Sequence, residues 1–221
     1  MRKTVFCVLM MTLLLSACAV GGDNGELTAE ELAAQIRTEY LTASSCAGTA
    51  VVTADYGLRV YDFTLDFVWR REGETTLTVT APEELAGLTA IVGKGESRLE
   101  FQGVSLGTGD LTGEGLTPLE YLPAVMAYIG DGYMAECVYE TVGERETLRI
   151  LFRDPEQKPQ EGLECSLWFD KSTHRLLRAE LSQGGQSVLH SGFATFTLGE
   201  DTNEMAEDED LDGDPSGQSG T

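Results

Sequence analysis

Residues 59–71 read RVYDFTLDFVWRR, and from Tyr61 to Trp69 every second side chain is apolar. In an extended chain, one face would carry Tyr61, Phe63, Leu65, Phe67 and Trp69, and the other would carry Asp62, Thr64, Asp66 and Val68. This period of two predicts a β-strand with one buried face. The following tract, TTLTVTAP, continues the alternation by placing Leu77 and Val79 against threonines. The sequence therefore predicts two neighbouring strands at this point of the chain.

Similar short runs recur along most of the chain, separated by Gly, Pro, Asp or charged turns. They are GLTAIVG (87–93), SRLEFQG (97–103), YMAECVYETV (133–142), TLRILFR (147–153), LECSLWFD (163–170), HRLLRAEL (174–181) and SVLHSGFATFTL (187–198). Successive short strands joined by tight turns indicate an antiparallel sheet or barrel.

Two segments have the spacing of helices instead. Thr28 and Glu31 have the spacing of a capping box and precede apolar residues at helical intervals, which predicts a helix over residues 29–42. A second helix is predicted in TPLEYLPAVMAYIGDGY (117–133), which starts with Thr117 and Pro118. Its apolar stripe consists of Leu119, Leu122, Val125, Met126 and Ile129. The predicted fold class is α+β, mainly antiparallel β, in the order helix, meander, helix, meander.

The first residues, MRKTVFCVLMMTLLLSAC, have a short basic start and an apolar stretch that is too short to span a membrane. They predict a signal peptide over residues 1–17. Leu15-Ser16-Ala17-Cys18 resembles the lipobox of bacterial lipoproteins, which implies lipid on the Cys18 sulfur and anchoring at the extracytoplasmic face of the cell membrane. A tether over residues 18–26, a domain over 27–199 and a disordered acidic tail over 200–221 complete the expected organisation.

Charge and cysteine usage narrow the function further. The net charge of −22 argues against binding to nucleic acid and against a surface patch that binds anionic lipid head groups. Of five cysteines, Cys46, Cys137 and Cys165 would remain in the folded domain. Their pairing stays open, because Cys165 shares a strand face with apolar residues and a buried thiol fits there equally well. No Cys or His spacing suggests a metal site, and no cofactor is predicted.

Three features of the sequence resemble catalytic or metal sites, but each lacks a part that the chemistry requires. GVSLG (103–107) matches the G-x-S-x-G pattern around Ser105, but no helix follows it directly. His174 and His190 lie in a turn and a late strand without an evident nucleophile. The tail sequence DEDLDGD resembles the start of a calcium loop but lacks its final glutamate. The chain is therefore predicted not to be an enzyme.

Several of these segments together resemble the LolA/LolB-like lipoprotein carrier superfamily, and more narrowly its members in spore-forming Gram-positive bacteria, including germination lipoproteins. The segments that carry the resemblance are ELAAQIRTEYL, the paired strands YDFTLDFVWRR and TTLTVTAP, PEELAGLTAIVG, SRLEFQG, TPLEYLPAVMAYI and LWFDKSTHRLLRAEL. The resemblance implies an unclosed half-barrel whose concave face is covered by helices. It also implies an apolar concavity that receives acyl chains in the carriers. Soluble carriers lack a lipobox, so this chain departs from them at Cys18.

The resemblance and the aromatic strand face together suggest a ligand site on the concave face. Its expected residues are Tyr61, Phe63, Leu65, Phe67, Trp69, Leu77, Val79, Phe101, Leu122 and Met126. The first expected function is binding of a lipid or other apolar ligand there. The alternative is a tethered protein that binds and regulates a cell-envelope enzyme, for example in spore cortex modification or germination. The same residues would form an ordinary core if the helices fill the concavity, and folding requires their burial in either case.

Overall fold

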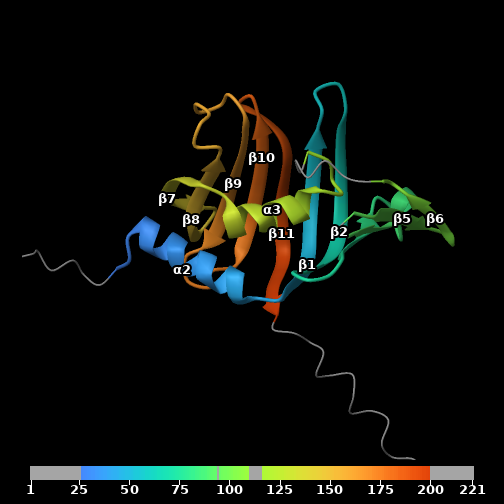
Figure 1. Ribbon diagram of the computed structural model, residues 1–221, viewed down its shortest axis with the longest axis horizontal. Coiled ribbons are helices and arrows are strands. Elements are labelled where there is room, and N and C mark those ends of the chain that lie inside the picture. Colours follow the sequence, from blue (N-terminus) through green and yellow to red (C-terminus); the bar gives the residue numbers. More distant parts are fainter. Residues whose placement is uncertain (1–25, 94, 110–115, 200–221) are drawn as a thin grey trace, which may run out of the picture.

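The computed structural model describes residues 26–93, 95–109 and 116–199 as one large sheet with two helices against it (Figure 1). The predicted signal peptide, Cys18 and the acidic tail lie outside these ranges. Within the described part of the chain, neither helix has the length and apolarity needed to cross a bilayer.

The elements follow the predicted order of helix, meander, helix, meander. Helix α2 spans Ala29–Thr42 and helix α3 spans Tyr121–Asp131. The first meander consists of β1 (Ser45–Asp55), β2 (Val60–Arg70), β3 (Thr75–Ala81), the short helix η1 (Glu83–Leu85), β4 (Thr89–Val92), β5 (Ser97–Phe101) and β6 (Val104–Gly107). The second consists of β7 (Met134–Val142), β8 (Arg145–Arg153), β9 (Leu163–Asp170), β10 (Leu176–Gln183) and β11 (Gln186–Gly199).

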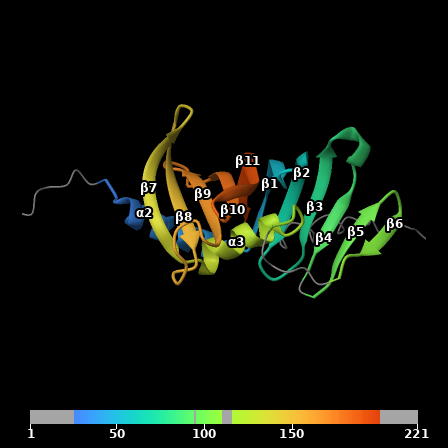
Figure 2. The ribbon, with the colours of Figure 1, turned by 90° about the horizontal axis from the view of Figure 1, so that it is seen from above.

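The two meanders join into one antiparallel sheet of 11 strands because the first strand, β1, pairs with the last, β11. The strand order is β6-β5-β4-β3-β2-β1-β11-β10-β9-β8-β7, so β6 and β7 form the two edges and do not pair with each other. The sheet is strongly curved, and both helices lie on its concave side (Figure 2). The predicted α+β class with an unclosed antiparallel sheet is confirmed.

Helix α2 begins and ends as its sequence predicts. The backbone N–H of Glu31 donates to the Thr28 hydroxyl at 3.2 Å, and the N–H of Thr28 donates to the Glu31 carboxylate at 2.9 Å, which completes the capping box. Near its other end the Tyr40 ring packs edge-on against Phe169, and the Tyr40 hydroxyl accepts from the backbone N–H of Leu176 at 2.9 Å. These contacts fix α2 against β9 and β10.

Helix α3 begins at Tyr121, three residues after the predicted start at Pro118. The segment before it forms a turn in which the Tyr121 N–H donates to the Thr117 carbonyl at 3.0 Å. Pro123 then occupies the first turn of the helix, where a missing N–H costs little. Directly after it, the Ala124 N–H donates to the Glu120 carbonyl at 2.9 Å in the regular helical pattern.

The turn between β9 and β10 is organised by one carboxylate. Oδ1 of Asp170 accepts from the Ser172 hydroxyl at 2.7 Å and from the N–H groups of Ser172 and Thr173 at 3.0 and 2.9 Å. Burial raises the pKa of Asp170, but these hydrogen bonds outweigh burial and lower the pKa to about 2.

This turn predicts a loss of stability in acid. The pKa of Asp170 is lower in the folded protein than the value of about 3.9 expected for the unfolded chain, so the ionised carboxylate stabilises the fold above pH ~4. That contribution, about 2 kcal/mol, should be lost as the pH falls from about 4 towards about 2. Urea unfolding at several pH values should show that the free energy of unfolding falls less with decreasing pH for Asp170→Asn than for the native chain. Equal declines in the two proteins would assign the acid sensitivity to other carboxylates.

Candidate functional site

A row of apolar side chains crosses the concave face of the first meander. Cross-strand pairing places its members side by side on β2 to β6, namely Phe67, Leu77, Ala90, Leu99 and Leu106. A second set lies beside it, in which Leu65 pairs with Val79 and Phe101 pairs with Val104. The apolar side chains that alternate along β2 therefore begin rows that continue across the neighbouring strands to the edge strand β6.

Five of the predicted ligand residues lie in the hydrophobic core. They are Leu65, Phe67, Leu77, Leu122 and Met126, all of them buried. The Phe67 ring packs against Phe193 and Phe196, each with a centroid distance of 5.8 Å. The Met126 sulfur of α3 lies 3.9 Å from the Cys46 sulfur of β1. At these positions the helices and the sheet fill the concavity.

The other five predicted ligand residues are less covered. Trp69 packs on the border of the core with the Arg71 guanidinium 5.4 Å from its ring centroid. Phe63, Val79 and Phe101 are half-buried, and Tyr61 is 39% exposed.

Two further apolar side chains, neither of them predicted from the sequence as ligand residues, extend this surface to the sheet edge. Val104 is 68% exposed and Leu106 is 64% exposed. The alternation of apolar residues in GVSLG is the signal that could have identified them. We name as the open apolar face the concave surface formed by Tyr61, Phe63, Val79, Phe101, Val104 and Leu106.

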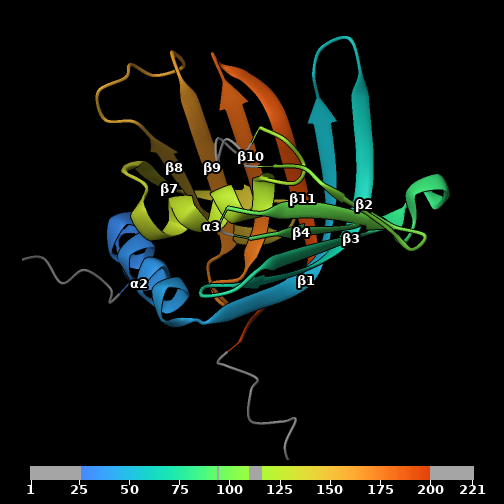
Figure 3. The same cartoon turned by 45° about the vertical axis from the view of Figure 1, so that its right-hand side comes forward.

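The open apolar face exists because the helices cover only part of the concave face, the part formed by the second meander and β1. Helix α3 starts over β10 and β11, where the Tyr121 hydroxyl donates to the Ala179 carbonyl at 2.7 Å and lies 2.9 Å from the Ser191 hydroxyl. Further along α3, the Tyr128 ring packs against Phe152 of β8. Figures 2 and 3 show α2 and α3 in front of the second meander and β1, with no helix of the described residues over β4, β5 and β6.

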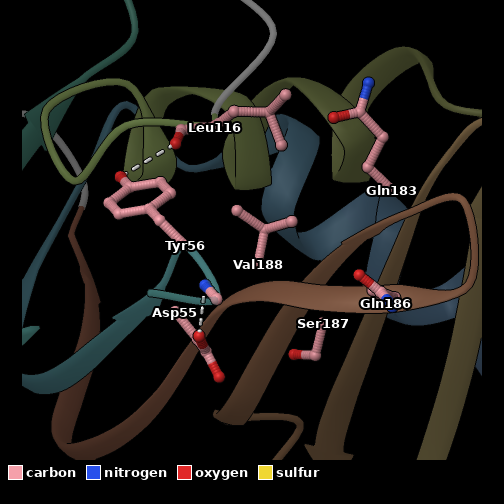
Figure 4. Close-up of a pocket in the computed structure, with 8 residues that line it drawn as sticks. Asp55, Tyr56, Leu116, Gln183, Gln186, Ser187 and Val188 are labelled. Atoms are coloured by element: carbon pink, nitrogen blue, oxygen red, sulfur yellow. Dashed lines mark hydrogen bonds between the residues drawn. The ribbon is translucent and has the colours of Figure 1, made fainter. Parts of the chain in front are cut away.

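A pocket of about 610 Å³ opens at the rim of the sheet, where the β1–β2 and β10–β11 turns approach the chain before α3. Figure 4 shows Tyr56 and Gln183 on opposite sides of it, with Val188 between them. The Tyr56 hydroxyl donates to the Leu116 carbonyl at 3.1 Å, which holds the ring across the space. The pocket residues come from turns and strand ends that lack a regular period, so no pattern in the sequence predicts them as a site.

The three described cysteines are free thiols. Burial raises the pKa of the Cys46 thiol to about 12 and raises the pKa of Cys165 and Cys137 as well, so all three remain protonated and weakly nucleophilic at neutral pH. Within the described residues, no group of three or more Cys, His, Asp or Glu side chains could hold a metal ion. The calcium-like tail sequence lies outside the described ranges.

The remaining chemical motifs are not brought together. Ser105 lies exposed in β6, an edge strand that no helix follows directly, so it does not sit on the strand-to-helix turn of a hydrolase. Nδ1 of His174 lies 2.8 Å from the Glu39 carboxylate of α2, and His190 lies in β11. His174 therefore tethers a turn to a helix rather than facing a nucleophile.

No family model and no curated protein matches the chain. Solved structures that are similar in fold include a LolA superfamily protein from Nitrosomonas europaea, with 12% identity, a TM-score of 0.41 and coverage of 81% of this chain and 97% of that one. Lipoprotein LppX from Mycobacterium tuberculosis shows 12% identity and a TM-score of 0.45, with 79% and 99% covered. The structure of the CwlD amidase in complex with the GerS lipoprotein, from Clostridioides difficile, shows 13% identity and a TM-score of 0.35. The match covers 80% of this chain and 95% of that one. Membership among germination lipoproteins stays a prediction.

Proposed function

We propose that the chain is a lipid-anchored extracytoplasmic protein that binds an apolar ligand, such as an acyl chain, on the open apolar face. The anchor is supported by the signal-like residues 1–17 and by Cys18 in its lipobox-like setting. Binding is supported by one observation, which is that the apolar rows continue beyond the strands that the helices cover and end exposed at β6. Regulation of an envelope enzyme is motivated by the predicted lipid tether, by the lack of a catalytic residue set in the sequence and by the resemblance, and it stays a prediction.

The energetics favour a ligand on this surface. A soluble domain gains about 1.5–3 kcal/mol for each large apolar side chain that is fully removed from water. Leu65, Phe67 and Leu77 obtain this gain from the core, whereas Val104 and Leu106 remain mostly in water. A contiguous exposed apolar surface of this kind is typical of interaction sites. An acyl chain laid along the rows would cover it without a charged or hydrogen-bonding partner.

The proposal predicts that a charge placed in the open apolar face weakens binding of an apolar probe. N-phenyl-1-naphthylamine is a suitable probe because it is uncharged and fluoresces more strongly in apolar surroundings. The full chain should bind the dye, and Leu106→Asp should raise the dissociation constant by roughly tenfold, because ligand binding would then desolvate a carboxylate. Fluorescence titration measures both values.

Ser105→Asp provides the matched control. Ser105 is the neighbour of Leu106 in the same strand, is also exposed and points to the opposite face of the sheet. The substitution adds the same charge as Leu106→Asp but on the other face of the sheet, so it should leave the dye affinity unchanged. Absence of dye binding to the native chain, or an equal loss in both variants, would contradict the proposed function.

A further inference from the structure

The pocket at the rim of the sheet has an apolar wall and a polar side. Tyr56 and Val188 form the apolar wall, and Gln183 and Gln186 supply two carboxamides at the facing ends of β10 and β11 (Figure 4). Neither carboxamide has a hydrogen-bond partner among the described residues. A carboxamide both donates and accepts hydrogen bonds, which matches it to hydroxyl groups.

The charge of the pocket disfavours an anion. Its described lining contains the carboxylate of Asp55 and no Lys, Arg or His side chain. Oδ1 of Asp55 accepts from the Gly57 N–H at 2.8 Å, which keeps this negative group beside the pocket. A phosphate entering here would meet a like charge without a compensating cation, whereas a neutral polyol would meet only hydrogen-bonding partners.

A run of aromatic rings connects this pocket with the open apolar face. The centroid of Tyr56 lies 6.3 Å from that of Tyr61, and the Tyr61 ring stacks on Phe63 at 6.4 Å. Tyr61 and Phe63 belong to the open apolar face, and Tyr56 lines the pocket. One molecule with an apolar chain and a compact polar head could therefore occupy both regions.

We propose that the pocket holds the uncharged, hydroxyl-bearing head of an amphiphile whose apolar chain lies on the open apolar face. The proposal rests on the proposed function and adds the chemical class of the head group. It assigns recognition to the carboxamides of Gln183 and Gln186 and rejection of anionic heads to Asp55.

Two probes with the same acyl chain test this assignment on the full chain. Monolauroylglycerol carries a neutral glycerol head, and lauroyl lysophosphatidic acid carries the same head with a phosphate. Each is titrated below its micelle concentration against bound N-phenyl-1-naphthylamine. The neutral probe should displace the dye at a concentration at least about tenfold lower than the phosphate ester, because the phosphate gains no paired charge in the pocket.

Variants of the carboxamides separate the head-group pocket from the apolar face. The double substitution Gln183→Leu and Gln186→Leu should reduce the preference to less than about threefold while dye affinity is retained, since only hydrogen bonds to the head are removed. Gln186→Lys should improve displacement by the phosphate ester by roughly tenfold through a new ion pair. Gln35→Leu, on the exposed side of α2, is the matched control and should change neither value.

The outcomes distinguish this inference from the proposed function. Dye binding without a preference for the neutral head would overturn the head-group assignment and leave the apolar site standing. A preference that survives the double substitution would also overturn it, because recognition would then lie elsewhere. A native chain that does not bind the dye would overturn the proposed function and the inference together.

Discussion

Replacing Phe67 by alanine is expected to lower the free energy of unfolding by about 3–5 kcal/mol, the usual cost of removing a buried aromatic ring. Phe67 is 2% exposed and packs against both Phe193 and Phe196, so its loss would leave a cavity where β1, β2 and β11 meet. Small domains have only about 5–15 kcal/mol of stability in total, so the variant should unfold at a much lower denaturant concentration. Equilibrium urea unfolding monitored by tryptophan fluorescence gives the difference.

Phe63→Ala provides the comparison that separates core from ligand surface. Phe63 lies on the same face of β2, four residues earlier, but is only half-buried. We expect a loss of about 1 kcal/mol in stability, together with a clear reduction in affinity for the apolar dye. A large stability loss in Phe63→Ala, or a small one in Phe67→Ala, would show that the boundary between the core and the open apolar face is misplaced.

The local elements could be predicted because their signals lie within a few residues. Alternation identifies β2 and β3, and the Thr28–Glu31 pair fixes the start of α2. Helix α3 starts three residues later than the sequence predicts, because Thr117 and Pro118 look like a helix start but form a turn before it. The pairing of β1 with β11 joins residues about as distant as the described chain allows, and no local pattern encodes it.

The sequence predicts which side chains of the candidate site lie on the concave side of the sheet, but it does not predict which of them are exposed. Alternation shows which side chains share the concave side of the sheet, yet their exposure depends on where α3 lies. That position is set by contacts far apart in sequence, such as those of Tyr121 with Ala179 and Ser191. The same apolar residue type therefore becomes core at Phe67 and surface at Leu106.

Gly48→Ala, at the junction of the two meanders, is expected to destabilise the protein by about 3 kcal/mol, at the upper end of overpacking effects. A Cβ atom at Gly48 would lie 2.1 Å from the Thr195 carbonyl oxygen and 3.0 Å from the Phe67 ring. The oxygen belongs to the backbone of β11 and cannot rotate away. Relief would require β1 and β11 to separate beside the irregular pairing between Thr49 and Ala50.

Gly192→Ala is the matched control, because it makes the same chemical change in β11 within the same strand pair. Gly192 pairs with Val51, and an added Cβ there would meet no atom within 4 Å. Its effect should stay within about 0.5 kcal/mol, as for most surface substitutions. Urea unfolding of the two variants side by side tests the contrast. If Gly48→Ala proved as stable as Gly192→Ala, the close approach of β1 and β11, and with it the continuous sheet that supports the open apolar face, would be wrong.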